Sequence, residues 1–180
     1  MFRLSKGAEY AIRGLVYMAM QPEGKVSYIE EIVKATDVPQ PYLAKLFQTL
    51  AKKGFVRSYR GPGGGFLLAR PTSDITLLEI IETMEGKIFL NDCLIHKGFC
   101  DRDEICPVHE IWKEAEARFL DVLKHSTLYK LAEAGRVKEK KAGTARPSAK
   151  HSVISRTAYR ASEQSRIRRG GTHAKRRGSG

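Results

Sequence analysis

A run of glycine and proline, Gly61-Pro62-Gly63-Gly64-Gly65, separates two short β-prone segments at 55–59 and 66–71. This pattern predicts a β-hairpin with a permissive tip. Two short amphipathic helices precede it. The first is expected to begin at the S-x-x-E capping box from Ser27 to Glu30, and the second to begin at Pro41 and end at Gly54. Two short helices followed directly by a hairpin are typical of a helix-turn-helix with a wing.

Further helices are predicted on both sides of this unit. Apolar spacing indicates one helix over 6–20, another over 76–86, and a long one over 107–124. The small domain is complete before the long helix, so we expect its apolar stripe to pack against the same helix of a second copy in a two-fold dimer. Packing onto the first helix of the same chain is the alternative. The expected fold class is mainly α with a small β-hairpin wing, in which a long C-terminal dimerisation helix follows the winged helix-turn-helix domain.

The net charge of +12 lies in the C-terminal segment. Residues 136–180 hold 14 lysine and arginine side chains against two glutamates, whereas residues 1–135 hold 18 basic and 18 acidic side chains. Low apolar content predicts a disordered basic tail. Its charge can neutralise DNA phosphates without fixed geometry, unless the tail is simply solvated. We divide the chain into a winged helix-turn-helix domain (1–86), a cysteine-bearing cluster loop (87–106), a dimerisation helix region (107–135) and the tail (136–180).

The sequence also limits the cellular compartment and the class of function that we expect. No stretch approaches the roughly 18 apolar residues of a membrane span, and the N-terminus lacks the pattern of a secretory signal, so a cytoplasmic protein is expected. In that reducing compartment the three cysteines are not expected to form structural disulfides. The sequence contains no P-loop, G-x-S-x-G or H-E-x-x-H motif, so we do not expect an enzyme.

The predicted winged helix supplies candidate DNA contacts. The second helix of a helix-turn-helix enters the major groove, and arginine in a wing is favoured in a narrow minor groove. The candidates are Gln40, Tyr42, Lys45 and Gln48 on the helix, with Arg57, Arg60, Gly63 and Gly64 on the wing. A solvated helix face and a plain hairpin form the alternative, but helix, turn and hairpin in this order favour DNA binding.

A second candidate site is the sequence Cys93, Cys100, Cys106 and His109, spaced C-x6-C-x5-C-x2-H. Thiolates select iron–sulfur clusters, zinc or copper(I). Zinc sites commonly use C-x2-C pairs, which are missing here, whereas an iron–sulfur cluster accepts three thiolates and one other ligand. Free or redox-active thiols are the alternative. His96 is a weaker candidate for the fourth ligand.

These residues together resemble the Rrf-two family of winged-helix transcription regulators, which includes IscR-like and NsrR-like members. The resemblance covers residues 1 to about 134. It is carried by Arg3-Leu4-Ser5-Lys6-Gly7 with Tyr10-Ala11, by Tyr42-Leu43, Leu46-Phe47 and Leu50, by Lys53-Gly54-Phe55-Val56, by Arg60-Gly61-Pro62-Gly63-Gly64-Gly65-Phe66-Leu67-Leu68, and by Cys106-Pro107-Val108-His109 with Trp112.

The resemblance implies a homodimer that binds a palindromic operator in double-stranded DNA and holds a cluster on Cys93, Cys100 and Cys106. The fourth ligand of IscR-like members falls on His109 and favours [2Fe-2S]. The acidic ligand of NsrR-like members falls on Glu9 and fits [4Fe-4S] with nitric oxide sensing. Both residues are present, so the choice stays open, with [2Fe-2S] preferred. The first cysteine gap is x6 where x5 is commoner, and the basic extension has no counterpart in the short tails expected of this family.

The function predicted from these observations is a DNA-binding transcription regulator, expected to be a repressor. It senses iron–sulfur status, redox state or nitric oxide through the cluster. One alternative is a cluster-free thiol switch of the same fold. The other is a zinc-stabilised module that binds nucleic acid through its basic tail.

Overall fold

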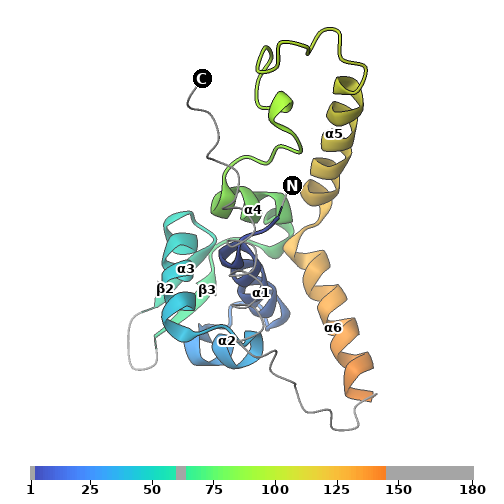
Figure 1. The fold of residues 1–180 in the computed structure, drawn as a ribbon. Coiled ribbons are helices and arrows are strands. Elements are labelled where there is room, and N and C mark those ends of the chain that lie inside the picture. Colours follow the sequence, from blue (N-terminus) through green and yellow to red (C-terminus); the bar gives the residue numbers. More distant parts are fainter. Residues whose placement is uncertain (1–2, 60–63, 145–180) are drawn as a thin grey trace, which may run out of the picture. The chain divides into compact units, whose positions relative to one another are not determined.

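The computed structural model describes residues 3–59 and 64–144, and Figure 1 shows the order of its elements. These are α1 (Lys6–Met20), β1 (Ser27–Tyr28), α2 (Ile29–Thr36), α3 (Gln40–Lys52), β2 (Val56–Tyr59), β3 (Gly65–Leu68), η1 (Thr72–Asp74), α4 (Leu77–Glu85), η2 (Asp92–Leu94), α5 (His109–His125) and α6 (Leu128–Thr144). The predicted fold class is confirmed: helices dominate, and the hairpin directly follows the helix-turn-helix formed by α2 and α3. No helix in the described ranges is both long and apolar enough to cross a membrane.

The wing belongs to a three-stranded antiparallel sheet in the order β1-β3-β2. β1 pairs Ser27 with Phe66, which makes the predicted capping box at Ser27 wrong. Ser27 is buried in the strand, and α2 begins two residues later, where the Tyr28 N–H donates to the Glu31 carboxylate at 3.1 Å. Gly65 is required for this pairing, because a Cβ there would lie 2.9 Å from the Ser27 carbonyl oxygen.

The main core joins α1, α2, α3 and the sheet. The buried side of α3, including Leu43, Phe47 and Leu50, packs against α1. A Cβ at Gly14 of α1 would lie 2.7 Å from the Phe47 ring, so glycine allows these two helices to approach closely. Leu128 of α6 is fully buried in the same core.

The C-terminal helix α6 extends beyond the predicted domain boundary. Gly135 lies against Met20, and the Arg136 guanidinium donates to the Ala19 carbonyl at 3.0 Å and to the Met20 carbonyl at 3.4 Å. These bonds satisfy carbonyl groups at the C-terminal end of α1, which have no partner within that helix. The prediction of a tail starting at Arg136 is therefore wrong, since α6 continues through Thr144. The rest of the predicted tail, 145–180, lies outside the described residues.

The long helix α5 uses one side of its apolar stripe within the chain. Leu123 is buried with Ile81 and Ile88. Another side exposes Ile111 (61%) and Val122 (64%), whereas Trp112 (40%) lies on the same side as Leu123, near the start of the helix. Part of the predicted stripe thus packs on α4 of the same chain, and dimerisation through the exposed part stays a prediction.

The junction between α5 and α6 is tied to the segment that enters α4. The Leu77 N–H donates to the Ser126 carbonyl at 2.8 Å, and the Leu128 N–H donates to the Ile75 carbonyl at 2.8 Å. Ile75 is fully buried in the main core. The base of α5 is therefore attached to the winged domain by backbone hydrogen bonds as well as by apolar packing.

Candidate DNA-binding face and cysteine site

The recognition helix α3 separates its buried and exposed sides as its sequence predicts. Gln40, Tyr42, Lys45 and Gln48 are all exposed, whereas the apolar residues between them are buried. The capacity of Gln and Lys to hydrogen-bond base edges is therefore available on this face.

Tyr42 also has a role inside the chain. Its ring makes an edge-on contact with Tyr10 of α1 at 5.7 Å between centroids, and its hydroxyl lies beside Gly7. The side chain is 41% exposed. Tyr42 thus links the start of α3 to α1, and only part of its surface is free for other contacts. Sequence periodicity does not show this contact, because the two residues are far apart along the chain.

The described part of the wing places Arg57 on the exposed side of β2. Gly64 is exposed, and its carbonyl accepts a hydrogen bond from the Ile29 N–H at 3.5 Å. Gly64 therefore connects the wing to the start of α2. Arg60 and Gly63, the other predicted wing contacts, lie outside the described residues.

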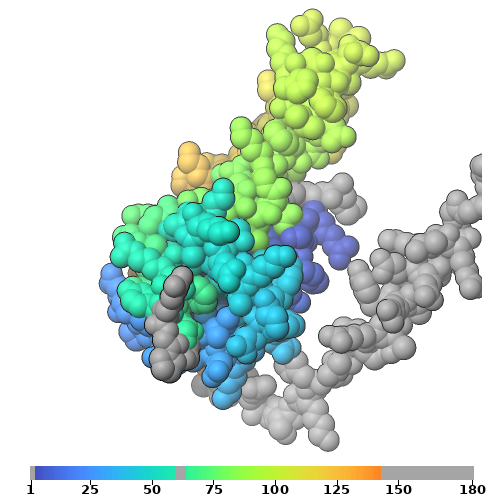
Figure 2. Space-filling view, turned by 90° about the vertical axis from the view of Figure 1, so that its left-hand side faces the viewer, coloured from blue at the N-terminus to red at the C-terminus, as the bar shows by residue number. Residues whose placement is uncertain are grey.

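The three cysteines line one cavity beside the N-terminal end of α5. The loop that carries them, 88–108, runs from α4 along α5 to the start of that helix, and Figure 2 shows this region standing away from the winged domain. Cys93, Cys100, Cys106 and His109 all line the cavity, whose volume is about 480 Å³. The cysteines are half-buried free thiols. The structure thus brings together the four residues that the sequence grouped by spacing.

Specific hydrogen bonds hold the cysteine loop in place. The Glu116 carboxylate on α5 accepts from the Leu90 N–H at 2.7 Å. Near the cysteines, the Cys106 N–H donates to the Arg102 carbonyl at 2.8 Å, and the Asp103 carboxylate accepts from the Gly98 N–H at 3.0 Å. Glu116 and Asp103 were missed by sequence reasoning, because neither a charged residue on the polar side of a helix nor one in a polar loop gives a periodic signal.

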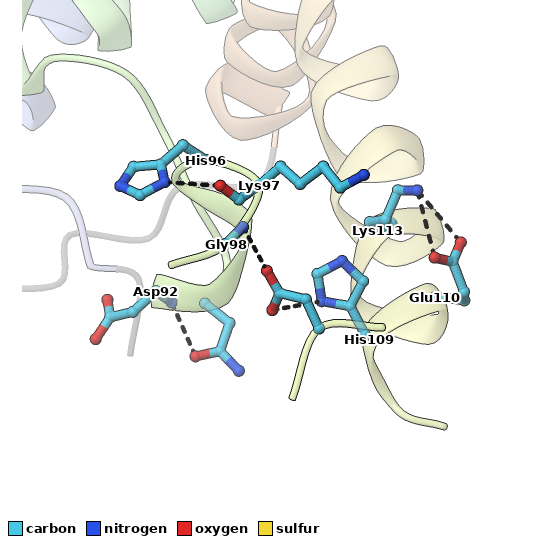
Figure 3. Close-up of polar contacts among 9 residues, drawn as sticks. Asp92, His96, Lys97, Gly98, His109, Glu110 and Lys113 are labelled. Carbon is cyan, nitrogen blue, oxygen red and sulfur yellow. Dashed lines mark hydrogen bonds and ion pairs between the residues drawn. The ribbon is translucent and has the colours of Figure 1, made fainter. Parts of the chain in front are cut away.

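Burial and neighbouring charges affect the ionisable groups that line the cavity. Burial raises the pKa of the Cys93 thiol, and the charges of Asp103, Cys100 and Cys106 add to that effect. His109 Nδ1 lies 3.5 Å from Asp103 Oδ1, with both side chains largely buried (Figure 3).

The donor set suits a cluster better than a single ion. Among the described residues, no three His, Cys, Asp or Glu side chains are placed to hold one metal ion. Tetrahedral zinc, at about 2.3 Å from each sulfur, requires sulfurs within roughly 4 Å of one another. A cluster distributes its ligands over more than one iron, so three thiols and an imidazole around a wider cavity are compatible with it.

The other two candidates for the fourth ligand do not line the cavity of the three cysteines. Glu9 on α1 forms an ion pair with Lys6 at 2.7 Å, and this hydrogen bond lowers the pKa of its carboxyl group. Glu9 does not line the cysteine cavity. His96 is exposed, and its ring packs edge-on against Phe99 at 5.3 Å. Within one chain, His109 is the candidate that shares a cavity with all three cysteines.

Comparison with known proteins agrees with this arrangement. The model of the Rrf2 family, described as "Iron-dependent Transcriptional regulator", matches residues 4–134. The chain belongs to the Rrf2 family.

Two curated relatives and one solved structure illustrate the similarity of this Rrf2 protein. An HTH-type transcriptional regulator of Aquifex aeolicus is 36% identical over 126 residues, which is 69% of this chain and 87% of the relative. The HTH-type transcriptional regulator IscR of Escherichia coli is 31% identical over 129 residues, covering 72% and 79%. The structure of CymR, the global cysteine regulator of B. subtilis, superposes with a TM-score of 0.62 at 26% identity, covering 74% and 98%.

Family membership confirms the coarser predictions. The Rrf2 protein is a DNA-binding transcription regulator with a winged-helix fold, and it is not an enzyme.

Proposed function

We propose that this Rrf2 protein controls transcription in response to an iron–sulfur cluster held by Cys93, Cys100, Cys106 and His109. The observation that carries the proposal is the single cavity lined by these four residues at the start of α5. When bound, a cluster would supply a group that reacts to redox state, nitric oxide or iron supply. An imidazole as the fourth ligand favours [2Fe-2S] over [4Fe-4S].

The family description as iron-dependent supports this proposal, as does the similarity to IscR. The donor chemistry supports it independently, since thiolates select iron–sulfur clusters and imidazole also binds iron. A preformed zinc centre has less support, because the described residues offer no set of ligands close enough for one ion.

The cysteine loop is connected to the DNA-binding domain through α5. Glu116 of α5 fixes the start of the loop to this helix, and His109 is the first residue of α5. At the other end of α5, Ser126 and Leu128 hydrogen-bond to the segment entering α4. A change in the loop can therefore move α5 relative to α3, and this movement alters operator affinity.

A second copy of the chain completes the proposed regulator. The exposed side of α5, with Ile111 and Val122, is the surface that we assign to the dimer. Two winged domains related by a two-fold axis read a palindromic operator, whose half-sites lie about one helical turn apart. Gln40, Lys45 and Gln48 of α3, which are exposed, are assigned to base edges. Arg57, with Arg60 of the wing, is assigned to the backbone or minor groove. Repression is the expected sign of regulation.

Anaerobic purification followed by iron, sulfide and zinc analysis tests the proposal. The wild-type protein is expected to be coloured and to contain iron and sulfide in equal amounts. Cys100→Ala should lose the visible absorbance and the iron, because one of the three thiolates is gone. It should keep its far-ultraviolet circular dichroism, because Cys100 lies outside both apolar cores.

Three results would count against the assignment. Full absorbance in Cys100→Ala would remove this residue from the ligand set. A colourless, iron-free wild type with reversible thiol oxidation would favour the cluster-free thiol switch. One equivalent of zinc, with loss of sequence preference in DNA binding, would favour the zinc-stabilised module.

A further inference from the structure

Asp103 is a buried carboxylate inside the cysteine loop. Its side chain is only 8% exposed, although it lies between Cys100 and Cys106 in a polar segment. Burial of a charged group is costly unless partners compensate it. Asp103 therefore needs a structural reason to point inward.

The two oxygens of Asp103 face different partners. Oδ2 accepts a hydrogen bond from the Gly98 N–H at 3.0 Å, which fixes the orientation of the carboxylate. Oδ1 faces His109 Nδ1 at 3.5 Å. Both of these facing atoms are buried, and neither has a hydrogen-bond partner among the described residues. Figure 3 shows the Gly98 amide and the His109 ring approaching one carboxylate from two sides.

The facing atoms are slightly too far apart for a hydrogen bond, which for N–H···O spans about 2.7–3.2 Å. A small closure of the loop around a bound group would bring them into contact. With Nδ1–H directed at a carboxylate, the other ring nitrogen, Nε2, carries the lone pair that can bind a metal. Metal-binding histidines usually donate their second ring N–H to a carboxylate, a carbonyl or water.

We propose that Asp103 is a positioning residue that fixes the tautomer and ring orientation of His109, so that Nε2 is presented to the cysteine cavity. This inference rests on the proposed cluster function and deepens it. It also provides a reason to prefer His109 as the fourth ligand. The alternative on α1, Glu9, is instead paired with Lys6.

A double-mutant cycle tests this role. Asp103→Asn removes the charge at nearly constant size. Glu104→Gln is the matched control, because Glu104 lies on the same loop, is exposed and does not line the cysteine cavity. Each substitution is made in the wild-type chain and in His109→Cys. A thiolate in place of the imidazole has no tautomer to fix and yields a ligand set of four cysteines.

The readouts are the visible circular dichroism spectrum of anaerobically reconstituted protein and the cluster half-life in the presence of an iron chelator. In the wild-type background, Asp103→Asn should change the spectrum and shorten the half-life. We expect a factor of about 10 to 100, in line with the usual loss of metal affinity when such a partner is removed. Glu104→Gln should match the wild type. In the His109→Cys background, Asp103→Asn should have no further effect.

Two outcomes would overturn the inference while leaving the cluster function intact. The first is a wild type with a normal cluster and an Asp103→Asn variant that is indistinguishable from it. The second is an equal loss in the His109→Cys background, which would mean that Asp103 acts on the loop through Gly98, or on folding, and not through His109. A wild type that binds no iron would instead refute the cluster proposal together with this inference.

Discussion

Single residues determine how closely the elements of this protein approach one another. The glycine run at 61–65 predicts a wing tip from sequence alone, but Gly65 is needed for another reason: β1 pairs directly against it. Gly14 similarly makes room for the Phe47 ring between α1 and α3. Local sequence indicates that a glycine is permissive, but not which distant residue needs the space. The inward orientation of Asp103 escaped prediction for the same reason.

The raised pKa of Cys93 gives a prediction for the metal-free protein. Burial disfavours the thiolate, which is the reactive form, so Cys93 should be alkylated by iodoacetamide more slowly in the folded than in the denatured protein at pH 8. Because the folded pKa lies above the unfolded one, this difference should narrow as the pH rises through the folded pKa. Peptide mass spectrometry after timed alkylation measures it. Equal rates in both states at pH 8 would contradict the effect of burial on this thiol.

At the scale of elements, the sequence predicted the helices that have strong apolar periodicity and missed the short or polar elements. The apolar spacing of α1, α3, α4 and α5 located these helices, and Thr76 caps α4 by accepting from the Glu79 N–H at 3.2 Å. β1 has two residues, too few for a pattern. The end of α6 is polar and basic, and short polar helices are marginal in isolation. Its beginning is stabilised by the burial of Leu128 and Ala132 in the main core, which the sequence does not reveal.

The recognition helix and the wing should contribute differently to DNA binding. Gln40→Ala removes a proposed base contact and should cost about 1–3 kcal/mol at one operator position. Arg57→Ala removes a proposed phosphate contact, so it should weaken binding to all sequences and reduce the salt slope by about one. Arg118→Ala, an exposed arginine on α5, is the matched control and should bind as the wild type does. Fluorescence anisotropy with operator variants at several salt concentrations measures these effects. Unchanged binding in both test variants would remove α3 and the wing from the interface.

At the scale of the whole molecule, the basic C-terminal region divides into the end of α6 and residues 145–180. Residues 145–180 hold ten lysine and arginine side chains against Glu163, whereas the segment from Arg136 to Thr144 belongs to a helix attached to α1. The positive charge that composition places in one tail thus falls into two parts with different expected roles. Composition alone could not locate this division, because Arg136 contributes the same charge whether it is solvated or bound to the end of α1.

Two truncations distinguish these roles. Removal of residues 145–180 should weaken binding to random DNA and flatten its salt dependence, because fewer counterions are released from the phosphates. Operator preference, dimer and cluster should be retained.

Removal of everything after Gly135 also deletes Arg136 and the end of α6. This longer deletion should in addition lower the free energy of unfolding by about 1 kcal/mol, a value reduced for the partial exposure of the arginine. Thermal unfolding and DNA titrations at two salt concentrations measure both effects. If the two truncated proteins had equal stability, the bonds from Arg136 to α1 would contribute nothing to it. If the shorter deletion lost operator discrimination, residues 145–180 would be part of the specific interface.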